Sequence, residues 1–253
     1  YSSAASDVYK RQVMATLGLW AVVAWWVQVP FSDLAGLTGA GEQLAKYFPP
    51  DATGFGRALG QMGVTIVIGI WGTLLAFALA VPLGLAAATN VHGSRMGYRL
   101  AREILNFCRA LPDPLLALIF ITGFGIGPFP GVLALGIHSC GFLGKAFAES
   151  LERLPPGIAE GLQACGASRS QVIRFGLWPS IGREVIGYTA YTTYRNILMA
   201  VALGVVGAGG IGVDLLRALR QFDRPAAAMM IGLIVAVVVL IDWFAVSLRE
   251  RSK

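Results

Sequence analysis

The chain has 253 residues, of which 56% are hydrophobic and only 13% are charged, and its mean hydropathy is +0.66. Soluble domains carry roughly 25% charged residues, so this composition excludes an ordinary soluble domain and indicates one all-α membrane domain. The formal net charge of +6 does not indicate a nucleic-acid-binding protein, because the basic residues cluster in loops beside apolar runs and suit contact with membrane lipid. Three cysteines without a C-x-x-C spacing exclude a disulfide framework.

The start of the chain contains a leader-like stretch and then the first predicted span. Residues 1–12 show no apolar period, and we interpret them as a non-native leader, which leaves residues 13–253 as a single transmembrane domain. Val13–Val29 is just long enough to cross a hydrocarbon core of about 30 Å. A cleavable signal peptide is the alternative, but no A-x-A-like site follows and Pro30-Phe31 is a poor cleavage region.

The second predicted span lies between an outer loop and a basic inner loop. Pro30–Met62 is polar and slightly acidic, which indicates the outside. Gly63–Asn90 is the span, and Pro82 within it predicts a kink because proline removes one backbone hydrogen bond. The next loop is basic and therefore predicted to be cytoplasmic. Its basic residues are His92, Arg95, Arg99 and Arg102.

The third predicted span, Glu103–Phe124, contains charges and helix breakers. Arg109 and Asp113 lie inside it, with prolines on both sides of Asp113. Non-helical backbone at membrane depth is tolerated only where protein or water covers it. Two interpretations remain. In the first, Arg109 and Asp113 pair with one another or the break lies at the membrane interface; in the second, the two residues line a pathway through the membrane.

The fourth predicted span, Gly131–Phe147, follows an uncharged turn rich in glycine and proline. His138 and Ser139 suggest a serine protease, but neighbours on a helix point about 100° apart, and no G-x-S-x-G motif is present. Small residues at a spacing of four predict a stripe for close helix packing. They are Gly136, Cys140 and Gly144.

A moderately polar stretch, Pro155–Pro179, separates the fourth and fifth apolar runs and predicts two short helices with a break. Two prolines suit the start of the first helix, and Gly166 suits a left-handed stop at its end. Ser168 and Gln171 have the spacing of a capping box, which restarts a helix. Pro179 predicts that this second helix ends at or before Trp178. A plain loop helix and a DNA-reading helix-turn-helix are the alternatives.

The fifth predicted span, Glu184–Val206, is the most polar of the set and carries Arg195 and Asn196. A charged residue in mid-membrane costs about 2.5–3.5 kcal/mol on insertion scales. We therefore expect this helix face to line the route of a substrate. The alternative is a helix buried between neighbours that satisfy its polar groups.

The end of the chain contains a glycine run, a charged loop and the last predicted span. Gly207–Gly212 matches G-x-G-x-x-G, but a dinucleotide-binding site needs a preceding strand and an acidic residue about 20 positions on, and both are missing. Asp214–Arg224 is predicted to be an outer loop whose arginines could attract an anionic substrate, the acidic rim of a binding protein or lipid phosphates. Ala226–Leu248 is the last span, and the basic tail after it indicates the cytoplasm. These spans predict six transmembrane helices with both termini inside.

The 155–179 stretch resembles a known signature. Glu160-Gly161, Gly166-Ala167-Ser168 and Leu177-Trp178-Pro179 are similar to the E-A-A, G-A-S and L-P elements of ABC importer permeases, with Gly161 in place of the usual alanine. The resemblance implies a type I permease fold in a bacterial inner membrane and a cytoplasmic coupling helix that docks on a dimer of ATPase subunits. The residues that it assigns to coupling are Glu160, Gly161, Ala164, Gly166, Ala167, Ser168, Leu177 and Pro179.

Two further stretches resemble the permeases of phosphonate and methionine importers. They are Arg109-Ala110-Leu111-Pro112 and Gly207-Ala208-Gly209-Gly210-Ile211-Gly212. The phosphonate subgroup usually has an arginine two positions after the asparagine of the fifth helix, whereas Leu198 stands there in this chain and Arg195 precedes Asn196. The residues assigned to the substrate pathway are Arg109, Asp113, Arg195, Asn196, Gly207, Gly209 and Gly210.

The resemblance implies import of a phosphonate or a related small phosphorus oxyanion by alternating access. It also implies three partners: the ATPase, an extracytoplasmic substrate-binding protein and a second permease copy in a homodimer. No cofactor, metal or catalytic residue is expected, and the chain has no G-x-x-x-x-G-K-[ST] loop with which to hydrolyse ATP. The alternatives are a permease of the same type for methionine, a stand-alone secondary transporter, which would need an internal repeat, and a membrane enzyme.

Overall fold

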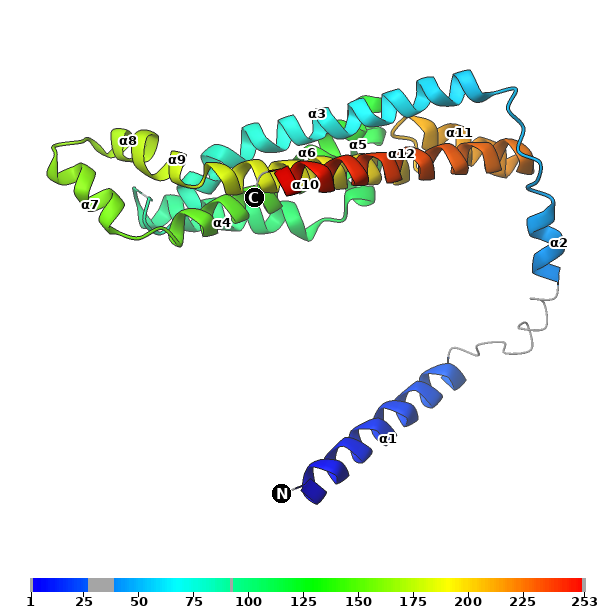
Figure 1. The fold of residues 1–253 in the computed structure, drawn as a ribbon, viewed down its shortest axis with the longest axis horizontal. Coiled ribbons are helices and arrows are strands. Elements are labelled where there is room, and N and C mark those ends of the chain that lie inside the picture. The colour runs from blue at the N-terminus through cyan, green and yellow to red at the C-terminus, as the bar shows by residue number, and fades with distance from the viewer. Residues whose placement is uncertain (1, 27–38, 92, 252–253) are drawn as a thin grey trace. The chain divides into compact units, whose positions relative to one another are not determined.

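The computed structural model describes residues 2–26, 39–91 and 93–251, which form helices and no β-strand (Figure 1). The chain divides into two compact units, Tyr1–Phe48 and Pro49–Lys253. Pro30-Phe31, the region considered for signal cleavage, and His92 of the basic loop lie outside the described residues.

The first unit contains helix α1, Ser2–Trp26, and the short helix α2, Ala40–Ala45. Helix α1 includes residues on both sides of Val13, so the leader-like stretch is helical as well. The large side chains between Val13 and Trp26, among them Trp20 and Trp25, are mostly exposed within this unit.

The second unit is a bundle of long helices with a hairpin of short helical segments at one end (Figure 1). Its elements are α3 (Phe55–Ala87), α4 (Arg95–Ala110), α5 (Asp113–Phe124), α6 (Pro128–Glu152), α7 (Gly157–Ala164), α8 (Arg169–Val172), the π-helix η2 (Ile173–Leu177), α9 (Trp178–Ser180), α10 (Gly182–Val205), α11 (Ile211–Arg220) and α12 (Arg224–Arg251).

Several of these helices have the length and composition of membrane spans. Among the described residues, α3, α6 and the Arg224–Trp243 part of α12 are long and apolar enough to cross a bilayer. Helices α4 and α5 meet that test only as a pair, and they are bent by 90° at the break between them. Helix α10 falls below the same hydropathy because tyrosines, threonines, Arg195 and Asn196 interrupt its apolar residues. The number of six spans therefore stays a prediction.

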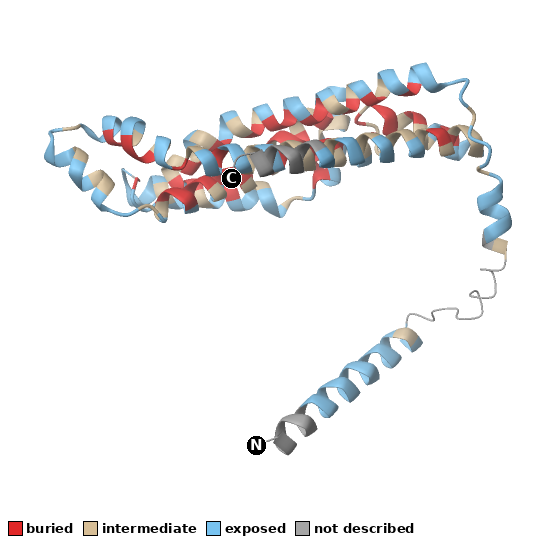
Figure 2. Cartoon of the chain, in the orientation of Figure 1, coloured by how far each residue is buried: buried red, intermediate tan, exposed pale blue. Residues whose placement is uncertain are grey.

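Helix α6 is the centre of the bundle and packs against α3, α4, α5 and α10. Figure 2 shows buried residues along the facing sides of α3 and α6, whereas the described side chains of α12 are mostly exposed or of intermediate burial. Large apolar side chains such as Leu143 and Phe147 are fully buried on α6. The apolar face of α12 remains suited to contact with lipid.

Small residues allow α6 to approach its neighbours closely, as the predicted stripe requires. A Cβ atom at Gly144 would lie 2.5 Å from Leu105 Cδ2 of α4, and a Cβ atom at Gly136 would lie 2.5 Å from Leu75 Cδ2 of α3. The third member of the stripe, Cys140, is 1% exposed. The prediction of close packing through this stripe is confirmed, and it fixes how near α3 and α4 lie to the polar residues of α6.

Three sequence predictions about element boundaries were wrong. Helix α3 begins at Phe55 rather than Gly63, because Ala58 and Met62 already form a buried helical face. The expected outer loop Asp214–Arg224 is mostly helix α11, whose buried residues Ile211, Asp214 and Ala218 recur at helical spacing. The helix expected to end before Pro179 continues, because η2 widens the turn and Pro179, which has no N–H, needs no carbonyl partner.

The close contact between α3 and α10 generates a prediction. A Cβ atom at Gly69 would lie 2.6 Å from Ile197 Cγ1 and 2.8 Å from the backbone of Ile197, so Gly69→Ala forces the two helices apart. We expect a loss of about 1–3 kcal/mol, measured as a lower apparent Tm of the detergent-purified protein. Gly60→Ala on the same helix meets no atom within 4 Å and serves as the control. An unchanged Tm for Gly69→Ala would contradict the packing described here.

Candidate functional site

Polar side chains that were predicted inside the spans meet where α10 packs against α5 and α6. The Arg195 guanidinium Nη2 lies 3.1 Å from Asp113 Oδ2 and 3.1 Å from His138 Nε2. The side chain of Asp113 is 5% exposed and that of Arg195 is 26% exposed. Arg195, Asp113 and His138 are called the charged cluster below.

Asp113 pairs with α10 across the bundle, so the interpretation that paired it with Arg109 was wrong. Arg109 is an exposed residue near the end of α4, whereas Asp113 is the first residue of α5. Pro112 holds extended backbone angles between them, with φ −60° and ψ 139°. The resulting 90° bend directs Asp113 into the bundle and leaves Arg109 outside the charged cluster.

The contact with Arg195 indicates which ring nitrogen of His138 acts as the acceptor. A guanidinium only donates hydrogen bonds, so the Nε2 atom that Arg195 contacts accepts and carries no proton. The proton of the ring is therefore on Nδ1, which lies 2.9 Å from the Leu111 carbonyl oxygen and donates to it. Arg195 and Asp113 form a one-to-one ion pair within the charged cluster.

The second carboxylate oxygen of Asp113 has no hydrogen-bond donor. Asp113 Oδ1 lies 3.0 Å from His138 Nδ1, but the Nδ1 proton is directed to Leu111 and Oδ1 is a buried oxygen without a hydrogen-bond partner. The short distance between Oδ1 and Nδ1 is therefore not a hydrogen bond. A buried acceptor without a donor costs about 1–3 kcal/mol and calls for an explanation.

Asn196 is fully buried beside the charged cluster and connects three helices. Its Oδ1 accepts a hydrogen bond of 2.7 Å from Ser139 Oγ of α6, and its Nδ2 donates one of 3.1 Å to Thr73 Oγ1 of α3. Thr73 in turn donates to the Gly69 carbonyl oxygen. Both ends of the Asn196 amide are satisfied by protein, so this network holds α3, α6 and α10 in one register.

The glycines that were assigned to the pathway lie in the turn between α10 and α11. Gly207, Gly209 and Gly210 have φ values of 107°, 83° and 74°, which favour glycine. A Cβ atom at Gly210 would overlap the Thr65 hydroxyl, which accepts a 2.9 Å hydrogen bond from the Ile211 N–H. Gly210 therefore lets this turn approach α3 closely, and the contact is with α3 rather than with the charged cluster.

The 155–179 segment has the predicted helix–break–helix form. Gly166 has a φ of 81° and separates α7 from α8. Ser168 and Gln171 form a capping box, in which the Ser168 N–H donates to Gln171 Oε1 at 2.7 Å. Both predictions are confirmed, so α7 and α8 are distinct helices joined by a defined turn.

Most residues assigned to coupling are exposed on this segment. The exposed ones are Glu160, Gly161, Ala164, Gly166, Ser168 and Pro179. Ala167 is half-buried and Leu177 is buried in the core that the segment shares with α6. Leu162 packs on Gly176, where a Cβ atom would lie 2.5 Å from Leu162 Cδ1. One side of the segment is thus apolar and packed on the bundle, and the other side is not covered by the rest of the described chain.

Two ion pairs connect the ends of the helices at the base of this segment. Arg102 Nη2 lies 2.8 Å from Glu152 Oε1, and Arg153 Nη2 lies 3.0 Å from Glu184 Oε2. Hydrogen bonds with Tyr188 and with Glu184 raise the pKa of Arg153, so its charge persists throughout the physiological pH range. Exposed pairs of this kind contribute little stability, but they determine which helix ends lie together.

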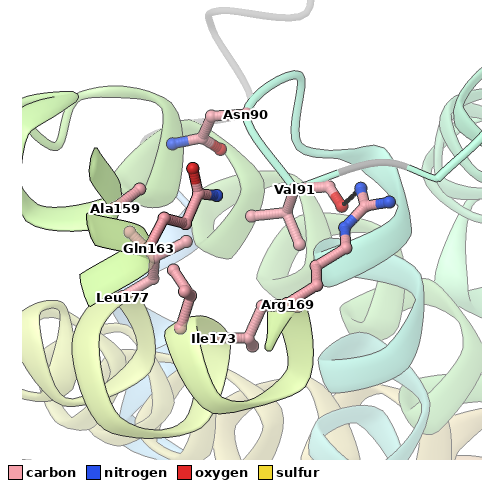
Figure 3. A pocket seen from close by; sticks show the side chains of 8 residues that line it. Asn90, Val91, Ala159, Gln163, Arg169, Ile173 and Leu177 are labelled. Atoms are coloured by element: carbon pink, nitrogen blue, oxygen red, sulfur yellow. Dashed lines mark hydrogen bonds between the residues drawn. The ribbon is translucent and has the colours of Figure 1, made fainter. Parts of the chain in front are cut away.

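A pocket of about 340 Å³ separates the 155–179 segment from the turn after α3. Figure 3 shows Gln163 and Asn90 facing this space from opposite sides, with Arg169 reaching the Val91 carbonyl oxygen. Arg169 therefore connects the start of α8 to the turn that follows α3.

Sequence reasoning did not predict that His138 belongs to the charged cluster or that Ser139 binds Asn196. It considered them only as protease residues, although they point to different neighbours, His138 to α5 and α10 and Ser139 to Asn196. A polar side chain inside an apolar run rarely lacks a partner. That rule indicates a role for both residues, but it cannot indicate which distant helix supplies the partner.

Comparison with known proteins gives a family match and curated relatives. Residues 80–253 match the family described as "Binding-protein-dependent transport system inner membrane component". The chain is 35% identical over 229 residues to the "Putative phosphite transport system permease protein HtxC" of Stutzerimonas stutzeri, covering 90% of this chain and 81% of that protein. It is 31% identical over 244 residues to the "Phosphite transport system permease protein PtxC" of the same organism, covering 96% and 89%.

A solved structure shares the fold. A chain of the inward-facing MetNI methionine ABC transporter superposes with a TM-score of 0.64 at 20% identity, covering 78% of this chain and 96% of that one. At this level of identity the likeness concerns the fold alone.

The network around Asn196 generates a prediction that a double-mutant cycle can test. Ser139→Ala and Asn196→Ala each remove one partner of the same buried hydrogen bond. We expect the double variant to lose at least about 0.5 kcal/mol less than the sum of the single losses, because the second change has no bond left to break. The measurement is the free energy of unfolding in detergent, with the exposed Thr122→Ala as a control. Additive losses would contradict the network.

Proposed function

Since this chain belongs to the family of binding-protein-dependent transport system inner membrane components, and is therefore the permease subunit of an ATP-driven importer, we propose that its substrate is phosphite or a phosphonate. The phosphite permeases among its relatives support this substrate class. The observation that carries the proposal is Arg195, a partly exposed guanidinium in the middle of α10 within an apolar bundle. A guanidinium fork matches the oxygen atoms of a phosphorus oxyanion.

The chain works with a separate ATPase and with a binding protein, as its family does. We propose that the exposed side of the 155–179 segment contacts the ATPase, because it presents Glu160, Ala164 and Phe175 outward while its other side is packed on α6. Phe175 is 66% exposed, and Arg174 lies over its ring. An exposed aromatic residue flanked by arginine is typical of a contact point for a protein partner.

The 155–179 segment is continuous with the helix that carries Arg195. Helices α8, η2 and α9 follow one another without a gap, and only Ile181 separates α9 from α10. Ile181 is buried, and Leu177 anchors η2 in the same core. A pull on the segment would therefore move α10 as a lever against α6. This movement is the alternating access that we propose, a rigid-body change between two packed states.

The substrate route that we propose runs along α10 past the charged cluster. Arg195 and Asp113 would contact the oxyanion, whereas Asn196 would hold the helices that form the wall. Arg109 and the glycines Gly207, Gly209 and Gly210 would border the route at its ends. We further propose that two copies of the chain pair in the inner membrane with both termini in the cytoplasm, which places the 155–179 segment on the side of the ATPase.

Coupling can be tested at Gly166. Gly166→Val places a β-branched residue at φ 81°, a conformation that costs non-glycine residues about 1–2 kcal/mol, although no atom lies within 4 Å of the added Cβ. We expect α7 and α8 to change their relative direction, so that uptake per ATP hydrolysed by the reconstituted importer falls severalfold.

Gly161→Ala is the matched control for this change. Gly161 lies inside α7 with no atom within 4 Å of the added Cβ, and alanine favours a helix by about 1 kcal/mol over glycine. We expect coupling to be kept or improved. Normal coupling in a Gly166→Val variant that still binds the ATPase would exclude the proposed contact.

The role of Arg195 can be tested separately from coupling. We expect Arg195→Ala to lower uptake by about 30-fold or more, because truncating one side of a largely desolvated charge pair costs at least ~2 kcal/mol. Copurification of the ATPase should not change. Arg195→Lys keeps the charge but loses the planar fork, and it should retain an intermediate rate. Full uptake by Arg195→Ala would make Arg195 a structural residue.

A further inference from the structure

The unsatisfied carboxylate oxygen of Asp113 lies beside the guanidinium that we propose to bind the substrate. Asp113 Oδ1 is buried without a hydrogen-bond donor, while Oδ2 of the same carboxylate holds Arg195 Nη2 at 3.1 Å. His138 Nδ1 lies 3.0 Å from Oδ1, but its hydrogen bond is made with the Leu111 carbonyl oxygen. The guanidinium of Arg195, which only donates hydrogen bonds, therefore lies beside the carboxylate of Asp113, which only accepts them.

We propose that Arg195 and Asp113 together form a site for an oxyanion that still carries one proton, a proposal that rests on the proposed function. A P–O⁻ oxygen of the ligand accepts from Arg195, and a P–OH group donates to Asp113. A monoprotonated phosphonate or phosphite has both kinds of oxygen. A sulfonate or sulfate has acceptors only. Its negative oxygen would therefore lie against the negative Asp113 carboxylate with no hydrogen atom between them to form a hydrogen bond.

The exposure of the three side chains gives the order of contact. Arg195 keeps 26% of its side-chain surface exposed and His138 keeps 17%, whereas Asp113 behind them keeps 5%. A ligand oxygen that takes over Arg195 Nη2 displaces the Asp113 carboxylate from that donor. The freed carboxylate then accepts the ligand hydroxyl, and this hydrogen bond replaces the contact that Asp113 loses.

In the described part of the chain, no other charged side chain forms a hydrogen bond or an ion pair with the charged cluster. Helix α6 contributes the imidazole of His138 and the hydroxyl of Ser139, and α3 contributes the hydroxyl of Thr73 through Asn196. On α4, Arg109 is exposed and lies beyond the 90° bend. The preference for a donor on the ligand therefore depends on Asp113.

Two probes of the same shape and charge test the proposal. Methylphosphonate at mildly acidic pH and methanesulfonate are both tetrahedral monoanions with a methyl group, but only methylphosphonate carries a hydroxyl. Saturation-transfer NMR on the methyl protons measures their binding to the purified permease–ATPase complex, in the absence of the binding protein and its own selectivity. We expect methanesulfonate to bind more weakly by about tenfold or more, because a charge-assisted hydrogen bond is missing.

The variant Asp113→Asn provides the decisive comparison, because its amide has the shape of the carboxylate and offers both a donor and an acceptor. We expect it to bind the two probes with nearly equal affinity. Equal binding of both probes by the unchanged complex, or discrimination that persists in Asp113→Asn, would overturn the proposal.

A parallel uptake assay separates failure of this site from failure of the proposed function. If neither probe binds a complex that still imports phosphite with its binding protein, the selective site is excluded and the proposed function stands. If the intact importer takes up no phosphorus oxyanion, the proposed function itself fails. Arg195→Ala should lose the signal of both probes, which confirms that the signal comes from this site.

Discussion

A positive charge inside an apolar bundle is the constraint on which the arrangement of this protein depends. Arg195 cannot face lipid, so a carboxylate must reach it from another helix. The break at Pro112 supplies that carboxylate by ending α4 and placing Asp113 at the start of α5. A buried ion pair adds little net stability compared with apolar residues of the same volume. Its presence, and the unsatisfied oxygen that accompanies it, therefore favour a role in binding over a role in folding.

The neighbouring polar network explains how the charged cluster can be both fixed in position and open to a ligand. Ser139 and Asn196 satisfy one another and join α6 to α10, with Thr73 adding α3. These buried groups carry no charge and have their partners within the protein. Arg195 projects from the same helix but keeps part of its surface exposed. The network thus aligns the helix, and the charged cluster beside it is left with an acceptor that the protein does not satisfy.

Local features of the sequence predicted much of the fold, whereas contacts between distant residues could not be predicted from it. The helix break near Pro112, the left-handed Gly166 and the capping box at Ser168 are determined by neighbouring residues, and each is present. The pairing of Asp113 with Arg195 spans 82 positions and depends on how α5 and α10 pack. Helix α11 was missed because its arginines suggested a loop, and the continuation through Pro179 was missed because a π-helix leaves no clear signal in the sequence.

The charged residues where α11 packs on α3 follow the same logic as the charged cluster. Helix α11 lies where the sequence predicted a basic outer loop, and its buried Asp214 holds Arg217 at 2.6 Å and Arg57 of α3 at 3.1 Å. These arginines are therefore bound to one carboxylate that fixes α11 on α3, and they count less as free charge than the sequence indicates. Asp214 thus joins α11 to α3, and Asp113 joins α5 to the middle of α10, each through a buried carboxylate that arginine neutralises. At Asp214 several donors serve one carboxylate, whereas at Asp113 one oxygen remains without a donor. This difference distinguishes a structural clamp from a site that is built to receive a ligand.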